Sequence, residues 1–307
     1  VTKTGRCWFK LSHGGENYAL LFSNVIDSTY DDGSISRPGD VGGNWMIQGM
    51  RVGLCKGLKE EPALWQTVTF DGTEQKKVSG KEVFATDPVS LKARAGDWLC
   101  YEISFTGGCY PYHEEAVLTM VPDKQMPLPL MIGSDRKISE RIGFLGDSIT
   151  QGCGTEDDSY THWAAKIAEK LPESCSVWDL GIGYARAADA ATDGEWLKRA
   201  KQCDKVHVCF GVNDTLRNYR AEEILQNLQM IVSKLKEAGC RVILLTLPPF
   251  DLEGEQRIQW QKVNKAIRES LCKEADGLFD IAAVLGQDAP NEHLCIYGGH
   301  PNAHGCA

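Results

Sequence analysis

The sequence predicts an α/β domain with a parallel sheet, preceded by an all-β domain. Before residue 135, short runs rich in β-branched and aromatic residues are separated by turn signals. After about residue 138, short apolar runs alternate instead with amphipathic helical segments. A chain of 307 residues is long enough for about two domains. We therefore expect a β-sandwich, jelly-roll-like domain over 1–135 and a parallel α/β domain over 136–307.

The first part contains six runs typical of strands. Glycine beside Asp or Asn punctuates them, as in FDGT at 70–73 and RAGD at 94–97. Such spacing favours an antiparallel sandwich or jelly roll. The expected strands are 17–24, 46–56, 64–72, 83–93, 97–107 and 115–121, and the proline-rich run 121–129 reads as a connector.

The second part contains five short apolar runs typical of buried parallel strands. They are 141–147, 175–182, 205–212, 241–248 and 278–285. Between them, the spacing of apolar residues predicts helices over 160–171, 221–238 and 256–275. In such sheets, ligands bind beyond the carboxyl ends of the strands. The residues that follow each strand are therefore the candidates for function.

The charge composition disfavours some classes of binding partner. The chain has 33 Lys and Arg against 42 Asp and Glu, a net charge of −9, and it has no basic run. These features disfavour nucleic acid and anionic membranes as partners. No apolar run approaches the roughly 18 residues that a membrane span needs. The oligomeric state is left open by the sequence.

The twelve cysteines form no CxxC pair, and several lie in apolar runs, where a free cysteine acts as a small buried hydrophobe. The tail gathers histidines and cysteines without the spacing of a zinc site, so we expect no metal. The cysteines favour a reducing compartment and hence the cytoplasm. Because the chain opens on Val1 rather than Met, a removed leader and secretion stay open.

Three polar residues follow predicted strands. Ser148 lies in GDSITQG after the first, where it is either a helix cap or a nucleophile. Asn213 lies in GVND after the third, as a turn residue or as an oxyanion donor. Near the end of the chain, glycines surround His300 in GGHPNAHG, where it is either structural or a base.

The order of these motifs resembles the SGNH/GDSL hydrolase superfamily of esterases and lipases. The resemblance covers roughly 138–307 and implies a flavodoxin-like three-layer α/β/α sandwich with no cofactor. It implies Ser148 as nucleophile, His300 as general base and Asn213 as oxyanion donor. The backbone N–H of Ser148 joins the oxyanion hole, and Asp147 is expected to brace the nucleophile turn.

The second motif departs from the family pattern. Relatives usually read Asn-Leu-Gly-x-x-Gly, whereas here Asp179 begins the motif and Tyr184 takes the place of the usual oxyanion glycine. A backbone N–H survives this change. The sequence leaves open whether Gly183 or Tyr184 donates it.

The last motif departs further, because Tyr297 stands where relatives carry the acid that orients the histidine. Three alternatives stay open. A Ser–His dyad works with a backbone carbonyl or Tyr297 holding the ring; Asp288 or Glu292 supplies the acid; or the protein is weakened or inactive.

The N-terminal part is similar to the β domain that precedes the catalytic domain in some bacterial SGNH hydrolases. Many such esterases remove acetyl groups from carbohydrates, so the expected substrate is a small-molecule or oligosaccharide ester. Trp45, in the turn-rich DVGGNWMIQG, is a candidate to stack on a sugar or to pack in the core. A short-chain lipase or thioesterase, and a carbohydrate-binding protein on a degenerate hydrolase fold, are the alternatives.

Overall fold

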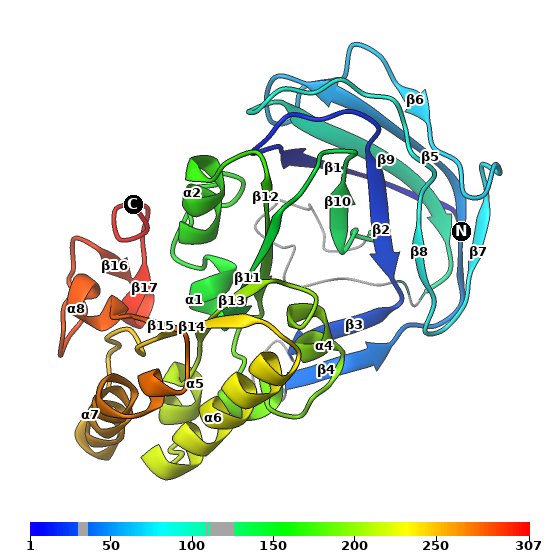
Figure 1. Ribbon diagram of the computed structural model, residues 1–307. Helices are drawn as coiled ribbons and strands as arrows, with labels where there is room; N and C mark the ends of the chain where they lie inside the picture. The colour runs from blue at the N-terminus through cyan, green and yellow to red at the C-terminus, as the bar shows by residue number, and fades with distance from the viewer. Residues whose placement is uncertain (30–35, 109, 111–125) are drawn as a thin grey trace. The chain divides into compact units, whose positions relative to one another are not determined.

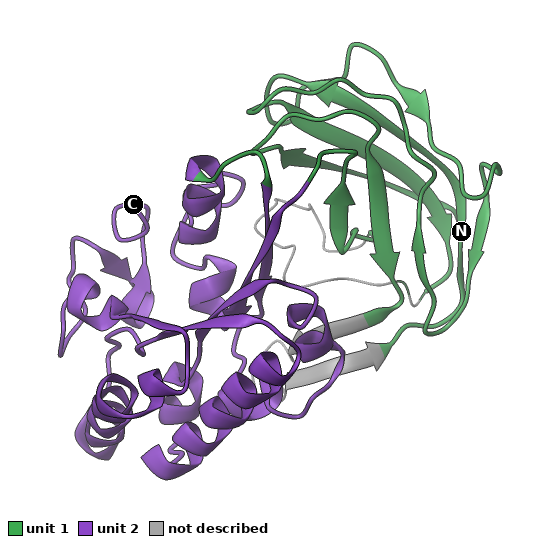
Figure 2. Cartoon of the chain, in the orientation of Figure 1, with its two compact units in different colours: residues 1–26, 39–137, 171–174 green, residues 27–38, 138–170, 175–307 purple. Residues whose placement is uncertain are grey.

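The computed structural model describes residues 1–29, 36–108, 110 and 126–307 (Figure 1). The chain divides into two compact units (Figure 2). The first comprises residues 1–26, 39–137 and 171–174, and the second comprises 27–38, 138–170 and 175–307. The domain boundary between 135 and 136 stays a prediction.

The first unit is built from antiparallel sheets. One has the strand order β1 (Lys3–Lys10), β9 (Trp98–Thr106), β5 (Trp45–Cys55), β6 (Gln66–Thr67), with β7 (Lys76–Val78) also paired to β5. Another has the order β10 (Met131–Gly133), β2 (Ala19–Ser23), β8 (Val83–Ala85), and β3 (Val25–Thr29) pairs with β4 (Ser36–Val41). The expected strand 115–121 lies outside the described residues.

One hydrophobic core joins the two larger sheets of this unit. Phe22 and Leu20 from β2 pack in the same cluster as Leu99 and Ile103 from β9 and Ile47 from β5. The alternation of these residues along each strand places every second side chain in the core. Antiparallel sheets over a shared core confirm the predicted N-terminal β architecture.

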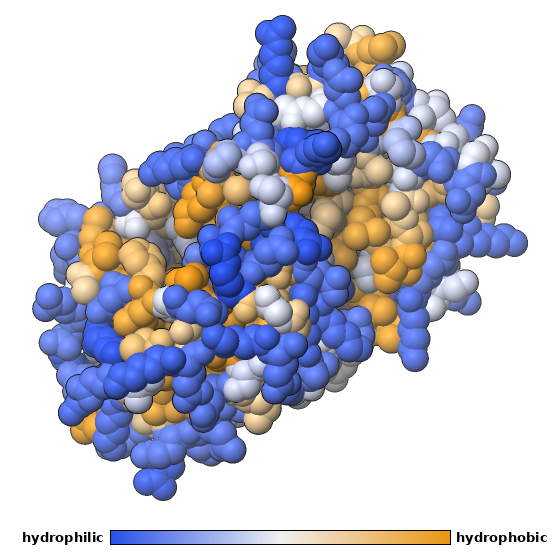
Figure 3. Space-filling view, viewed as in Figure 1, coloured by the Kyte–Doolittle hydropathy of each residue, from blue (hydrophilic) through white to orange (hydrophobic). Residues whose placement is uncertain are grey.

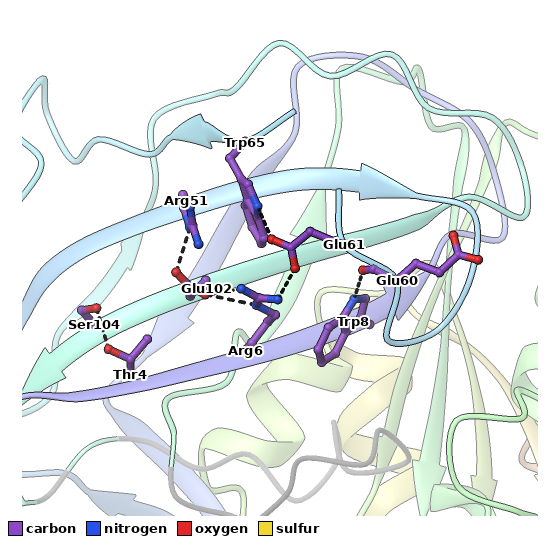
Figure 4. Close-up of polar contacts among 9 residues, drawn as sticks. All are labelled: Thr4, Arg6, Trp8, Arg51, Glu60, Glu61, Trp65, Glu102 and Ser104. Carbon is purple, nitrogen blue, oxygen red and sulfur yellow. Dashed lines mark hydrogen bonds and ion pairs between the residues drawn. The ribbon is translucent and has the colours of Figure 1, made fainter. Parts of the chain in front are cut away.

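The outer face of β1, β5 and β9 carries a charged network (Figure 4). Glu102 accepts hydrogen bonds from Arg6 Nη2 at 2.6 Å and from Arg51 Nε at 2.8 Å. The Arg51 guanidinium lies 4.4 Å from the centre of the Trp65 ring, and Trp65 Nε1 donates to Glu61. This face is therefore polar and internally paired, in contrast to the apolar inner face.

Trp45 lies in the core rather than at a loop tip. Its side chain begins strand β5, is 4% exposed, and packs against Phe84. Its indole Nε1 donates to Asn24 Oδ1 at 3.2 Å. Burial of so large an apolar ring is strongly favourable. The expectation that Trp45 stacks on a sugar is wrong, because the ring presents no free face.

The second unit contains a five-stranded parallel sheet. Its strand order is β12 (Cys175–Gly181), β11 (Glu140–Gly146), β13 (Lys205–Cys209), β14 (Arg241–Leu245), β15 (Gly277–Phe279). In the register of this sheet, Gly146 of β11 lies beside both Gly181 of β12 and Cys209 of β13. The loops that leave these three strands therefore start at one level.

Helices cover both faces of this sheet. Leu145, Val208 and Leu244 pack in a cluster with residues of α4 (Glu195–Ala200), α6 (Ala221–Glu237) and α7 (Gly254–Glu269). On the other face, Phe144 packs against Trp163 of α2 (Trp163–Lys170), and Cys209 against Ile281 of α8 (Ile281–Leu285). Mostly hydrophilic residues lie over α6 and α7 in Figure 3. This three-layer arrangement confirms the predicted α/β fold class.

Only the first part of the expected strand 278–285 is a strand. The run 278–285 forms the end of β15 and then the helix α8. Asp280 ends the strand, because its side chain caps α8 by accepting a hydrogen bond from Ala283 N at 3.3 Å. A short apolar run does not distinguish a strand from a buried helix by its periodicity. In the described part of the chain, no helix is long and apolar enough to cross a membrane.

We predict that Gly181→Ala destabilises the second unit. A Cβ at this position would lie 2.1 Å from the backbone nitrogen of Gln151, in the helix that follows β11. Backbone atoms move only with the whole turn, so we expect a loss of about 1–3 kcal/mol in the free energy of unfolding, measured by urea denaturation. The control is Gly49→Ala, whose Cβ would meet nothing within 4 Å. Equal stability of the two variants would contradict the packing argument.

Candidate active site

Strand β11, the first strand of the parallel sheet along the chain, leads into a tight helical turn. β11 ends at Gly146, and α1 (Ser148–Gln151) begins two residues later. Asp147 caps this helix, because its Oδ1 accepts a hydrogen bond from Ile149 N at 3.0 Å. Ser148 is therefore not the cap, and its half-buried hydroxyl is available for another contact. Asp147 braces the turn, as its expected role requires.

The Ser148 hydroxyl contacts a histidine from the far end of the chain. Ser148 Oγ lies 2.8 Å from His300 Nε2, and His300 Nδ1 lies 2.7 Å from the carbonyl oxygen of Tyr297. A carbonyl only accepts, so Nδ1 carries the hydrogen of the neutral ring and Nε2 accepts from the serine. This is the geometry that a general base needs.

The backbone before His300 directs the Tyr297 carbonyl. Tyr297, Gly298 and Gly299 form a short 3₁₀ turn, η4, with φ values of 46°, 74° and 135°. It connects β16 (Cys295–Ile296) to β17 (His300–Pro301). A Cβ at Gly299 would lie 2.5 Å from the Pro249 carbonyl oxygen, and the Phe250 ring lies edge-on to the His300 ring. The imidazole is therefore held on two sides.

The contact with Tyr297 matches one of the three open alternatives for orienting His300. Asp288 and Glu292, the candidate acids, are exposed, and the described contacts of the ring nitrogens involve neither carboxylate. Burial lowers the pKa of His300 below its ordinary 6.5, and the hydrogen bond to the Tyr297 carbonyl only partly opposes this shift. The ring is held in place without a carboxylate to favour its charged form.

The loop after β12 presents backbone amides beside the nucleophile turn. Ile182 N donates to Gly146 O at 3.0 Å, and Ala185 N donates to Ile182 O, which closes a turn with Gly183 and Tyr184 at its centre. Tyr184 has a φ of 62°, a conformation that usually selects glycine. Within the described chain, the N–H groups of Gly183 and Tyr184 have no acceptor, so both stay candidates for the oxyanion hole.

Asn213 lies on the loop after β13, in α5 (Val212–Leu216). Its Nδ2 donates to Ala185 O at 3.0 Å, which ties this loop to the loop after β12. The second hydrogen of the same amide has no acceptor among the described residues, so Asn213 stays a candidate oxyanion donor. The structure thus brings Ser148, His300, Asn213 and the Gly183–Tyr184 turn to the carboxyl end of the sheet.

Asp214 is a structural residue that the sequence reasoning missed. Its Oδ2 accepts a hydrogen bond from Ala187 N at 2.9 Å, at the start of α3 (Ala187–Ala190). Burial raises the pKa of Asp214 to about 6 and that of Asp147 to about 7, and the charge of Asp214 adds to the shift at Asp147. Asp214 follows β13, the sheet neighbour of β11, and its place in the GVND motif is the sequence signal that could have indicated this coupling.

A metal cluster, the cysteines and an apolar cavity are the other features considered for function. Across the described residues, no group of three or more His, Cys, Asp or Glu side chains is arranged to hold a metal. The described cysteines are free thiols, and Cys153 Sγ lies 3.7 Å from Gln151 Oε1. A cavity of about 320 Å³ between α2 and α8 is lined mostly by apolar side chains, and neither Ser148 nor His300 lines it.

Comparison with known proteins places this site in a family. The sequence profile of the GDSL-like Lipase/Acylhydrolase family matches residues 144–307, just over half of the chain. The chain therefore belongs to the GDSL-like lipase/acylhydrolase family, a family of hydrolases. The matched region contains both Ser148 and His300. No curated protein matches the chain.

Solved structures with a similar fold cover about half of the chain. A member of the lipolytic protein G-D-S-L family from Veillonella parvula DSM 2008 is 16% identical, covers 54% of this chain and 91% of its own, with a TM-score of 0.47. Axe2-D191A, a mutant acetylxylan esterase from Geobacillus stearothermophilus, is 20% identical, with 55% and 90% covered and a TM-score of 0.45. TesA is 20% identical, with 54% and 92% covered and a TM-score of 0.45.

We predict an acid limb of activity that lies below pH 6.5. His300 must be neutral to act as a base, and its pKa is lowered from the ordinary 6.5. The rate of ester hydrolysis should therefore fall only as the pH drops through this lowered value. The pH profile of kcat/KM measures it, because that parameter reports the free enzyme. An acid limb centred above pH 7 would indicate a carboxylate partner and would contradict the described contact.

We predict that Asp147→Asn changes how stability depends on pH. The folded-state pKa of Asp147 is raised from 3.8 to about 7, so the folded protein binds a proton that the unfolded chain releases. This group therefore contributes stability below pH 4 that is lost as the pH rises toward 7, by up to about 1.4 kcal/mol per pH unit. Asparagine keeps the cap and removes this titration.

The measurement is urea denaturation of native protein and Asp147→Asn at several values from pH 4 to 7. The difference between them should shift in favour of the variant as the pH rises. Taking the difference removes the opposite contribution of the buried histidines, whose pKa values are lowered. A difference that is constant over this range would sink the argument.

Proposed function

We propose that this protein is a serine esterase that hydrolyses short-chain, acetyl esters, with O-acetylated carbohydrates as substrates. The observation that carries the proposal is the 2.8 Å contact between Ser148 Oγ and His300 Nε2, at the carboxyl end of the sheet. Family membership supplies the reaction class, acyl transfer to water. The proposal assigns the roles of the individual residues and the acyl and alcohol parts of the substrate.

The proposed mechanism has two half-reactions. His300 Nε2 takes the proton from Ser148 Oγ while Oγ attacks the ester carbonyl carbon. Collapse of the tetrahedral intermediate breaks the bond to the alcohol, which leaves with the proton from His300. Water then gives a proton to His300 and attacks the acyl-serine ester. The carboxylic acid departs, and Ser148 regains its proton.

The oxyanion of each intermediate meets three donors in this proposal. They are the N–H of Ser148, the N–H of Gly183 or Tyr184, and the side-chain amide of Asn213. Donors that are fixed before the reaction stabilise the developing charge without reorganising. The Tyr297 carbonyl holds the imidazole, although it stabilises the imidazolium less than a carboxylate would.

Two observations support a short acyl group and a polar alcohol. The apolar cavity between α2 and α8 is lined by Ile149 and Pro301, the chain neighbours of Ser148 and His300, but not by the dyad itself, so the proposal places no long acyl chain in it. Among the exposed side chains on the loops that form the site, the two tyrosines at 184 and 297 are more exposed than the aliphatic Ile296. These features favour an acetyl ester of a sugar over a lipid.

We predict that an acyl-length series separates this proposal from its alternatives. The kcat/KM for p-nitrophenyl acetate should exceed that for the octanoate by about tenfold or more, because the proposed site takes an acetyl-sized acyl group. A preference for octanoate would instead indicate the lipase or thioesterase.

Ser148→Ala and His300→Ala are the matched variants for the same assay. Each should lower kcat by at least about 1,000-fold, because the nucleophile and its base act as a unit. If the native and variant rates coincide, the esterase proposal is contradicted and the carbohydrate-binding alternative is supported.

A further inference from the structure

Two exposed tyrosines lie on the backbone segments that form the candidate site. The side chain of Tyr184 is 52% exposed and that of Tyr297 is 77% exposed. Within the described residues, neither ring packs on another ring and neither hydroxyl has a hydrogen-bond partner. Large aromatic side chains are usually well buried when they serve the fold. These two rings therefore do little for the packing of the unit that carries them.

The backbone at both positions is unfavourable for tyrosine. Their φ values of 62° and 46° lie in the left-handed region, which glycine adopts freely and asparagine tolerates. At each position, glycine would provide the same turn without steric conflict. A largely exposed side chain that strains the backbone and has no ring or hydroxyl partner in the described residues points to a role outside the fold.

Both tyrosines belong to backbone segments that contact the site. The carbonyl of Tyr297 is the group that holds His300 Nδ1, at 2.7 Å. Tyr184 lies in the turn whose amides are candidates for the oxyanion hole, and a Cβ on the neighbouring Gly183 would lie 3.1 Å from Gln151 Oε1, in the same helical turn as Ser148. Both side chains therefore leave the segments that hold His300 and offer candidate oxyanion donors.

We propose that the rings of Tyr184 and Tyr297 bind the sugar ring of an acetylated carbohydrate. This inference rests on the proposed function and names the residues that select its alcohol part. The flat apolar face of tyrosine packs on the C–H face of a pyranose, and its hydroxyl pairs with sugar hydroxyls. An aliphatic chain would instead require an enclosed apolar pocket. The two rings also lose little conformational freedom on binding.

The test compares two acetyl esters in Tyr184→Gly and Tyr297→Gly. Xylose tetraacetate has a sugar ring, and ethyl acetate has the same acyl group without one. Glycine removes the ring and keeps the left-handed backbone. Both tyrosines also lend backbone atoms to the site, so any disturbance there lowers kcat/KM for both esters alike. The ratio of the two kcat/KM values isolates the ring, and we expect each variant to lower it about tenfold, mainly through KM.

The controls retain an aromatic ring or remove one elsewhere. Tyr184→Phe and Tyr297→Phe should keep most of the native ratio. Phe279→Leu removes a ring that is 50% exposed on the edge strand β15 and should leave the ratio unchanged. An unchanged ratio in both glycine variants would overturn the inference while the proposed function stands. If the native protein hydrolyses ethyl acetate but not xylose tetraacetate, both the proposed carbohydrate substrate and this inference are contradicted.

Discussion

The site depends on the parallel register of three strands. Gly146 of β11 lies beside Gly181 of β12 and Cys209 of β13, so the loops that follow these strands leave the sheet at one level. Ser148, the Gly183–Tyr184 turn and Asn213 come from these loops. A slip of one residue in any strand would move its loop by about 3.3 Å and rotate its side chains to the other face. Close packing at Gly181 against the backbone of Gln151 resists such a slip.

The orientation of His300 follows from backbone rather than from a carboxylate. A peptide carbonyl fixes the tautomer of the imidazole as well as a carboxylate does, because both accept the Nδ1 hydrogen. It offers only a dipole to the imidazolium, so burial dominates and the pKa of His300 falls. An acid at this position would both orient the ring and stabilise its positive charge. The Tyr297 carbonyl only orients it.

The sequence predicted the fold class and the positions of Ser148, Asn213 and His300, because strand alternation and motif order are local signals. It left three alternatives for the group that orients His300, one of them a backbone carbonyl, because the direction of the Tyr297 carbonyl depends on three successive positive φ values. Trp45 was misassigned because glycine-rich flanks indicate a loop but do not reveal burial. The helix α8 was read as strand because the capping role of Asp280 interrupts an apolar run that has no periodicity of its own.

The protonation state of the His300 ring shows whether the Tyr297 carbonyl orients the imidazole. Nitrogen-15 NMR of histidine-labelled protein, with His300→Ala to identify the signals, reports which ring nitrogen carries the hydrogen. With the Tyr297 carbonyl as the partner of Nδ1, we expect a neutral ring at pH 7 that carries its hydrogen on Nδ1 and none on Nε2. We expect this ring to titrate below pH 6.5. An imidazolium at pH 7, or a neutral ring with its hydrogen on Nε2, would contradict this expectation.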